Sequence, residues 1–474
     1  MTIIGRTEEI KQLDKFYTSG RPELVIVYGR RRVGKTFLIK EYFENNLSFY
    51  FSGIIGVPGN INLSRFDKAI EEYGGESKAE SKDWFDAFDK LKELLKKSPG
   101  ERKTVFIDEM PWLDIGKSMF LPAFDNFWNS FASSNPDILF IGCGSATSWI
   151  IKKIFHNKGG LHNRVTGRIY LAPFTIAESE LFLRSREIDI TRYQMAECYM
   201  IFGGIPYYLN YFERGLSFSQ NVDRLCFSSN AVLKNEFNEM FMSLLNNPNR
   251  HILIIEALSG KNTGLSRNEI LEATGLNSNG HISTTLNELE QCDFIAKATD
   301  YSKQKNGAYY YLKDPFTLFY LRFIKNNTTQ DDYFWTNFRD DGRHRAWSGY
   351  AFEHLCRMHL REIKNKLGIL GVSTVTTSWR SKSHDPGVQV DMIIERRDGV
   401  TNLCEMKYTL HPYEITKPYA DHLQQKKAVF IMETGTRNAI HLTMITTFGV
   451  AKKGYISSIH SEVTLEDLFV MLQA

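Results

Sequence analysis

The chain has 474 residues, of which 42% are apolar and 24% charged, and its formal net charge is only +3 at pH 7. This composition is typical of a globular protein with about two to four domains, and the small net charge permits nucleic-acid binding without requiring it. No apolar run approaches the roughly 18 residues of a membrane helix, and charged residues such as Arg6 and Lys11 stand where a signal peptide would be apolar. The six cysteines form no Cys-x-x-Cys pair, which argues against structural zinc and disulfides. We therefore expect a cytoplasmic protein without membrane contacts.

The first strongly patterned segment is a predicted strand, a glycine-containing turn and a predicted helix. Residues 24–28 (LVIVY) are apolar like a buried strand, and residues 36–43 (TFLIKEYF) have helical periodicity. The run GRRRVGKT between them fits the phosphate-binding pattern G-x-x-x-x-G-K-[ST] at every fixed position. At such a turn the backbone N–H groups and the helix N-terminus face bound phosphates. We therefore predict that the chain binds a nucleoside triphosphate, in preference to the alternative of an unrelated basic turn.

The residues of this loop have separate expected roles. The two glycines allow the backbone to wrap the phosphates closely, Lys35 is expected to neutralise the β- and γ-phosphates, and the Thr36 hydroxyl is expected to reach Mg²⁺. ATP and Mg²⁺ are thus the predicted cofactors. The predicted phosphate-binding residues are Gly29, Arg30, Arg31, Arg32, Val33, Gly34, Lys35 and Thr36.

Two later strands are predicted to end in polar residues of the same site. The strand TVFI is followed by Asp108, which we expect to hold Mg²⁺, and by Glu109, which we expect to orient the attacking water. The strand ILFI leads into GCGSAT, where Ser145 or Thr147 is placed to sense the γ-phosphate. A plain polar turn after a strand is the alternative for this last motif.

Helical segments separate these strands, at residues 84–97 and 121–131, and one more strand follows at residues 168–171. Strands that alternate with helices build a doubly wound parallel sheet. We therefore predict an α/β core of this type over residues 1–176.

Over roughly residues 1–245 the sequence resembles the archaeal-type ATPases of the AAA+ and STAND-like division of P-loop proteins. The resemblance rests on the IGR run with Glu9 and Leu13 ahead of the loop, on GRRRVGKT, FIDEM and GCGSATS, and on the GGIP run at residues 203–206. It implies ATP hydrolysis, and it implies a helical lid over residues 177–247 that contains the GGIP run.

The resemblance also implies roles for arginines outside the loop. Arg6 would lie near the adenine, although an amphipathic first helix explains this segment without any ligand. Arg164 or Arg168 would complete the site in cis or from a neighbouring subunit, which would make the ATPase core a surface for self-association. A solvated loop arginine is the alternative for Arg164.

Residues 248–313 have the pattern of three short helices and a hairpin that turns at residues 303–307, an order typical of a winged helix-turn-helix. The third helix of such a domain would enter the major groove of DNA. Here it contains Glu288 and Glu290 and no lysine or arginine, which is a poor electrostatic match to DNA. Packing between domains is therefore an equal alternative to DNA binding. Residues 314–344 are predicted as a linker.

A second group of chemically useful side chains lies in a predicted hairpin near the C-terminus. The strands VQVDMII and VTNLCEMK flank a turn-forming Asp-Gly pair. Asp391 lies in the first strand, whereas Glu405 and Lys407 share one face of the second because they are two residues apart. Two carboxylates on paired strands can hold Mg²⁺ while a lysine orients the attacking water, as phosphodiester hydrolysis requires. Glu353, on a predicted upstream helix, is a further candidate metal ligand.

The hairpin resembles the PD-(D/E)xK nucleases of restriction-endonuclease fold, whose αβββαβ order fits residues 345–474. A Gln-Val pair precedes Asp391 where the name of the motif has proline. The fit uses a helix over residues 348–367, another over residues 413–425 and a strand over residues 428–432. A domain that keeps this shape and has lost turnover is the alternative.

Two hypotheses follow for the whole α/β chain. The first is an ATP-hydrolysing protein with an attached Mg²⁺-dependent nuclease that acts on DNA under nucleotide control. The second is a nucleotide-dependent molecular switch that binds DNA or a protein partner, with a catalytically inactive nuclease-like domain. Asp391, Glu405 and Lys407 favour the first, and the acidic third helix of the winged region favours the second.

Overall fold

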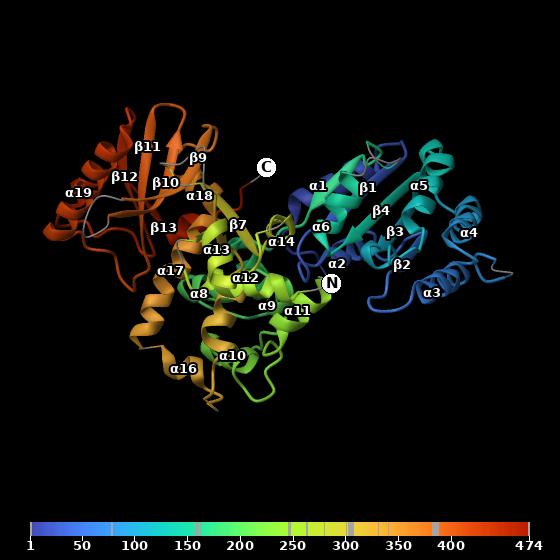
Figure 1. Ribbon diagram of the computed structural model, residues 1–474, viewed down its shortest axis with the longest axis horizontal. Coiled ribbons are helices and arrows are strands. Elements are labelled where there is room, and N and C mark those ends of the chain that lie inside the picture. Colours follow the sequence, from blue (N-terminus) through green and yellow to red (C-terminus); the bar gives the residue numbers. More distant parts are fainter. Residues whose placement is uncertain are drawn as a thin grey trace. The chain divides into compact units, whose positions relative to one another are not determined.

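The computed structural model describes residues 2–76, 79–156, 161, 163–244, 248–261, 264–278, 280–299, 301, 308–329, 331–339, 341–381 and 388–472. The chain divides into two compact units, which are coloured along the sequence in Figure 1. Unit 1 comprises Met1–Pro173 and Met240–Asn247, and unit 2 comprises Phe174–Glu239 and Pro248–Gln473. Within the described ranges, no helix is long and apolar enough to cross a membrane.

Unit 1 is built on a five-stranded parallel sheet of order β2-β3-β4-β1-β5. Its strands are β1 (Glu23–Tyr28), β2 (Phe49–Ser52), β3 (Lys103–Asp108), β4 (Ile138–Gly144) and β5 (Gly167–Tyr170). The central strands β1 and β4 are buried along almost their whole length, which is why they are continuous apolar runs in the sequence. The predicted parallel α/β core is confirmed.

Short helices alternate with these strands. They are α1 (Thr7–Tyr17), α2 (Lys35–Tyr42), α3 (Gly59–Glu72), α4 (Trp84–Lys97), α5 (Phe120–Ser130) and α6 (Thr147–Ile150), with the single turns η1 (Met110–Trp112), η2 (Ala132–Ser134) and η3 (Ile151–Phe155). The start of α4 follows from its sequence, because the Asp83 side chain caps it by accepting a hydrogen bond from the backbone N–H of Asp86.

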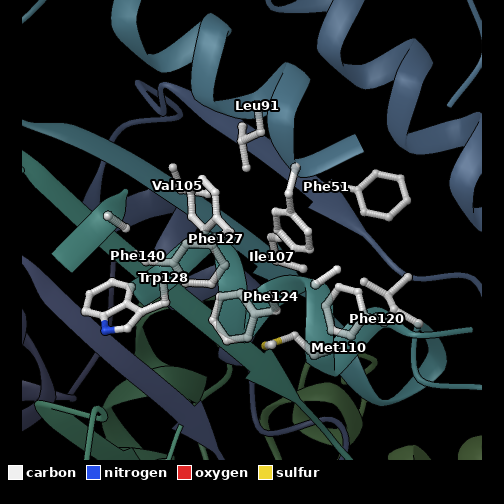
Figure 2. Packing of buried hydrophobic residues seen from close by; sticks show 14 of the residues in the cluster. Phe51, Leu91, Val105, Ile107, Met110, Phe120, Phe124, Phe127, Trp128 and Phe140 are labelled. Carbon is white, nitrogen blue, oxygen red and sulfur yellow. The ribbon is translucent and has the colours of Figure 1, made fainter. Parts of the chain in front are cut away.

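An aromatic core packs α4 and α5 against the sheet (Figure 2). The rings of Phe124 and Phe140 lie 4.8 Å apart between α5 and β4, and Phe88 of α4 stacks on Phe127 of α5 at 5.1 Å. Aromatic pairs of this kind contribute about 0.5–1.5 kcal/mol each beyond their buried area. The core therefore fixes β3 and β4, whose ends carry the predicted polar residues.

Unit 2 begins with a helical region that contains the GGIP run. Its helices are α7 (Ile176–Ser185), α8 (Arg192–Phe202), α9 (Pro206–Leu209) and α10 (Phe218–Cys226), whereas α11 (Glu236–Leu244) begins in unit 2 and ends in the Met240–Asn247 segment of unit 1. Gly203 ends α8 in a left-handed conformation, and a Cβ on Gly204 would lie 2.2 Å from the carbonyl oxygen of Phe174. The two glycines are thus required by a helix end and by a close backbone approach.

The next region contains three helices and a small antiparallel sheet of order β6-β8-β7. The elements are α12 (Asn249–Ser259), β6 (Leu265–Ser266), α13 (Arg267–Thr274), α14 (Gly280–Gln291), β7 (Ile295–Thr299) and β8 (Ala308–Leu312). Three helices and a small sheet were expected here, but the turn predicted at residues 303–307 lies outside the described residues, and the winged helix stays a prediction. The acidic helix α14 turns Glu288 toward His251, whose Nε2 lies 2.9 Å from the carboxylate.

The C-terminal region holds a mixed five-stranded sheet of order β13-β12-β11-β10-β9. β10 is antiparallel to both β9 and β11, whereas β11, β12 and β13 run parallel. The elements are α17 (Gly342–Met358), α18 (Leu360–Lys366), β9 (Thr374–Arg380), β10 (Gln389–Arg396), β11 (Val400–Lys407), α19 (Lys417–Thr434), β12 (Ala439–Thr446), η6 (Ile456–Ser458), β13 (Ser461–Thr464) and η7 (Leu465–Phe469).

Three expectations for this region require correction. The strand predicted at residues 428–432 is wrong, because these residues continue α19 and the strand lies at β12; a short apolar run does not distinguish the two structures. The helix predicted at residues 348–367 is broken at His359 into α17 and α18.

The predicted linker, residues 314–344, contains α15 (Pro315–Phe319), η5 (Tyr320–Ile324) and α16 (Phe334–Phe338). Its aromatic side chains are buried against one another; for example, the ring centres of Trp335 and Phe319 lie 5.0 Å apart.

Candidate functional site

The phosphate loop joins β1 to α2 and depends on glycine at two positions. Gly29 has φ 141°, and a Cβ there would lie 2.4 Å from the carbonyl oxygen of Leu171. The backbone N–H of Leu171 donates to the carbonyl of Tyr28 at 2.8 Å, so the chain leaving β5 passes over the start of the loop. Gly34 precedes α2 with φ 89°, a conformation that L side chains rarely adopt. The turn therefore places the N-terminus of α2 beside the loop, where an anion is favoured.

Lys35 and Thr36, the first two residues of α2, point to different partners. The Lys35 ammonium is buried and donates to the carbonyl oxygens of Gly29 at 3.0 Å and Arg30 at 2.8 Å, both within the loop. The Thr36 hydroxyl donates to the Asp108 carboxylate at 2.5 Å. Asp108 ends β3, two strands away from β1, so the sheet order brings these groups together.

Glu109 is held at the end of β3 by Ser145 at the end of β4. Its backbone is left-handed, with φ 49°, and its N–H donates to the Asp108 carboxylate at 2.8 Å. Its own carboxylate accepts hydrogen bonds from the Ser145 hydroxyl at 2.7 Å and the Ser145 N–H at 3.3 Å. Ser145 therefore contacts the predicted catalytic acid, which the sequence did not indicate.

Two observations test whether this cluster fits Mg²⁺ and a nucleotide. The Thr36 hydroxyl and the Asp108 carboxylate meet at one point and are hard oxygen donors of the type that Mg²⁺ takes. The Thr147 hydroxyl is buried and has no hydrogen-bond partner within the described part of the chain. A buried hydroxyl near the end of β4 is satisfied if a ligand brings acceptor oxygens. The residues present fit the pair of cofactors.

Asp391 and Glu405 lie on the antiparallel strands β10 and β11, directly beyond the last paired residues, Met392 and Cys404. Their carboxylates are close enough for Asp391 to repel the charge of Glu405. The Asp391 carboxylate is buried and accepts a hydrogen bond from the backbone N–H of Met406 at 3.0 Å. The register of β10 against β9 shifts between Val390 and Ile393, a stretch that contains this aspartate.

The Glu405 carboxylate is surrounded by donors. Both of its oxygens accept hydrogen bonds from the Lys426 ammonium at 2.7 Å, and the Tyr419 hydroxyl lies 3.4 Å away. The Lys407 ammonium lies 3.9 Å from the same carboxylate, as their shared strand face predicts. Burial, followed by repulsion from Asp391, raises the pKa of Glu405.

Glu353 and Arg357 lie one turn apart on α17 and join this cluster to a cavity. The Arg357 guanidinium donates to the backbone carbonyl of Asp391 at 2.7 Å and lies 3.6 Å from the Glu353 carboxylate. Burial, followed by repulsion from Asp391, raises the pKa of Glu353 to about 7. Both side chains also line a cavity of ≈ 180 Å³ within unit 2, together with Lys261 and Arg322.

The adjacent carboxylates of Asp391 and Glu405 fit a divalent cation in their chemistry, because Mg²⁺ is commonly bound through one or two carboxylates with water completing its shell. Glu353 does not complete a three-ligand group: none of the described residues form a set of three or more His, Cys, Asp or Glu side chains able to hold a metal ion. The fit is therefore limited to this carboxylate pair.

Comparison with known proteins supports the nucleotide site. A family model described as an ATPase domain predominantly from Archaea matches residues 3–212. Residues 3–212 are therefore similar to the ATPase domains of this family. An uncharacterized ATP-binding protein of Methanocaldococcus jannaschii is 48% identical over 42 residues, which cover 9% of this chain and 71% of that protein.

Two longer similarities extend beyond residues 3–212. An uncharacterized protein of M. jannaschii is 26% identical over 433 residues, which cover 90% of this chain and 92% of that protein. The solved structure of a Walker-type ATPase of Pyrococcus abyssi is similar with a TM-score of 0.50 and 18% identity, covering 68% of this chain and 96% of that chain. At this identity the second likeness concerns the fold alone.

Two of the arginines predicted to serve the ATPase domain have definite surroundings. The Arg6 guanidinium is buried and donates to the carbonyl oxygens of Ala172 at 2.7 Å and Val33 at 3.1 Å, so it joins the loop to the chain after β5. The Arg168 guanidinium lies 4.2 Å from the centre of the Phe155 ring. Arg164 is exposed in the turn before β5. The expected roles of Arg6 at adenine and of Arg164 in catalysis stay predictions.

Sequence reasoning missed Lys426, Tyr419 and Arg357 as members of the C-terminal cluster. Lys426 and Tyr419 are seven residues apart on α19 and therefore share a helix face. The helix had been predicted to end at residue 425, which left Lys426 outside it. Arg357 stands four residues after Glu353 on a helix, a spacing that could have indicated the pair.

Proposed function

We propose that this chain is an ATP-hydrolysing protein whose β10–β11 hairpin forms a Mg²⁺-dependent nuclease site that acts on DNA under nucleotide control. The observation that carries the nuclease part is the neighbouring carboxylates of Asp391 and Glu405 on paired strands, with Lys407 3.9 Å from Glu405. The ATPase domain supplies the nucleotide dependence.

In the ATPase domain each polar side chain has a proposed role. Lys35 would bind the β- and γ-phosphates, and Thr36 and Asp108 would hold Mg²⁺, which would neutralise charge on the phosphates. Glu109 orients the attacking water, and Ser145 holds Glu109 in position. Arg164, exposed before β5, is available to complete the site in cis or across a self-association surface.

In the nuclease-like domain the carboxylates of Asp391 and Glu405 would hold the metal, which would supply Lewis-acid stabilisation of the attacked phosphate. Lys407 would orient the attacking water. The cavity beside Glu353 supports a phosphate-bearing substrate, because the cations Lys261, Arg322 and Arg357 line it.

Cleavage assays on the full chain test this function. Single-stranded, duplex and branched DNA would be incubated with Mg²⁺ or Mn²⁺, with and without ATP. The variant Asp391→Asn should lose cleavage while ATP hydrolysis continues, because its contacts lie in unit 2 and the phosphate loop lies in unit 1. Asp398→Asn, at the exposed hairpin turn, is the matched control and should cut like the parent. If the parent cuts none of these substrates in any nucleotide state, the nuclease function is rejected.

A nucleotide-dependent switch with an inactive nuclease-like domain is the second candidate. The contact of Lys426 with both oxygens of Glu405 favours it, because this ammonium already neutralises a proposed metal ligand. The acidic α14 favours a protein partner over DNA at the winged region. Under this candidate, ATP binding changes the affinity for DNA or a partner, and no metal-dependent cleavage occurs.

A further inference from the structure

Lys426 lies in an apolar environment, where burial of its ammonium is unfavourable unless an acid pairs with it. It lies on the sheet-facing side of α19 between Leu423 and Phe430, which are both fully buried members of the same core. Its side chain is 10% exposed and that of Glu405 is 3% exposed. A buried ammonium in apolar surroundings requires a partner of opposite charge, and here both oxygens of Glu405 accept from it at 2.7 Å.

Cations already contact the acids of this cluster without any metal. Among the described residues, Glu353 is a third acid near the carboxylate pair, and three cations contact these acids. The acids are Asp391, Glu405 and Glu353, and the cations are Lys426, Lys407 and Arg357. A divalent cation at Glu405 would be repelled by the cations that already contact this carboxylate.

We propose that Lys426 competes with the divalent cation for Glu405, so that metal binds to the Asp391–Glu405 pair only when the Lys426 ammonium withdraws. The inference rests on the proposed metal site. Lys426 is the cation concerned because it contacts both oxygens at 2.7 Å, whereas Lys407 lies 3.9 Å away. Two cations that share one buried carboxylate repel each other strongly, since the effective dielectric constant there is far below that of water.

A supporting role for Lys426 would give the opposite result. If the lysine only holds Glu405 in the rotamer that a metal requires, its removal weakens metal binding. If it competes, its removal strengthens metal binding. The sign of the change in affinity therefore separates the two roles.

The experiment is a titration of the nucleotide-free full chain with Mn²⁺ at pH 8, in which free Mn²⁺ is followed by electron paramagnetic resonance. Lys426→Met keeps the apolar stem of the side chain and removes the charge, and Lys426→Gln is a second variant that keeps a polar end. Lys427→Met, the neighbouring position on α19, is the matched control. Thermal unfolding and ATP binding verify that each variant is folded.

We expect Lys426→Met and Lys426→Gln to bind Mn²⁺ at least about tenfold more tightly than the parent and Lys427→Met. Adding Asp391→Ala to Lys426→Met should abolish this gain, which assigns it to the carboxylate pair. An affinity that is unchanged or lower in both folded Lys426 variants overturns the competition, while Mn²⁺ binding by the parent that requires Asp391 would still support the metal site. If neither the parent nor a Lys426 variant binds Mn²⁺ through Asp391, the competition and the proposed metal site both fail.

Discussion

The Ser145 hydroxyl donates a 2.7 Å hydrogen bond to the Glu109 carboxylate and so links the ends of two neighbouring parallel strands. Glu109 needs such a partner, because its backbone lies in the left-handed region, which is unfavourable for a side chain of its size. The contact makes the position of the proposed catalytic acid depend on β4 as well as on β3.

Removing this contact should slow turnover without preventing binding. Ser145→Ala leaves Glu109 with only the weaker backbone contact at 3.3 Å, so we expect kcat for ATP to fall about tenfold, a loss of about 1.4 kcal/mol of transition-state stabilisation. Steady-state phosphate release measures the change, with Ser148→Ala, three residues further on and partly exposed, as the control. An unaltered kcat would show that Ser145 does not position Glu109.

The buried ammonium of Lys35 should dominate phosphate binding. Lys35→Ala removes the charge that lies inside the loop, and we expect the affinity for a non-hydrolysable ATP analogue to fall by at least about tenfold, or roughly 1.4 kcal/mol. Isothermal titration measures it. Lys40→Ala, on the same helix but next to the ring of Tyr50, should bind like the parent. Equal affinity for Lys35→Ala and the parent would contradict the loop assignment.

Substitution of Glu109 should slow ATP hydrolysis without weakening ATP binding, because Asp108 and not Glu109 is the proposed Mg²⁺ ligand. Glu109→Gln keeps the size of the side chain and its contact with Ser145, so ATP should bind normally while hydrolysis slows at least about tenfold, or roughly 1.4 kcal/mol. Single-turnover hydrolysis beside an ATP-binding titration checks both values. A fully active variant would move the role to another acid. Asp114, the next acid along the chain, already accepts a hydrogen bond from the Trp149 indole at 3.2 Å.

Unit 2 should lose stability in mild acid through His359. Its Nε2 accepts from the backbone N–H of Ile176 at 3.0 Å, its Nδ1 donates to the carbonyl of Leu355 at 2.9 Å, and burial lowers its pKa to about 4. The unfolded chain, with a pKa near 6.5, binds the proton more tightly, so this contribution is complete above about pH 6.5 and is lost as the pH falls toward 4.

By pH 5 the loss of unfolding free energy from His359 should be roughly 2 kcal/mol. Denaturant unfolding of the parent and of His359→Gln at pH 7 and pH 5 measures it. The variant should show a smaller loss between the two pH values, whatever its stability at pH 7. An identical loss in both proteins would contradict the neutral buried histidine.

The sequence predicted the elements whose physical cause is local. Continuous apolar runs revealed β1, β3 and β4, and the loop motif placed Lys35 and Thr36 at the start of α2. The strand β2 was not predicted, because four residues, FYFS, are too short to establish a pattern. α19 was mistaken in part for a strand, since the run AVFIM is apolar in either structure.

Contacts between distant segments were the part that sequence reasoning did not reach. The placement of Asp391 and Glu405 on the two strands of one hairpin was predicted, because a hairpin is a local structure. The pairing of Glu405 with Lys426 depends on how α19 packs on the sheet, and the hold of Ser145 on Glu109 depends on where two strands end. Both contacts result from tertiary packing, which the spacing of residues along the chain does not determine.

The strand order has a consequence for the order in which the nucleotide site is completed during synthesis. β1, which carries the phosphate loop, pairs only with β4 and β5 among the described strands, and β3, which carries Asp108, pairs only with β2 and β4. A nascent chain that has emerged as far as residue 130 therefore contains the whole loop and both acids, yet it has no strand to join them. ATP can therefore stabilise the folded domain only after β4 has left the ribosome and inserted between β3 and β1, which are synthesised earlier.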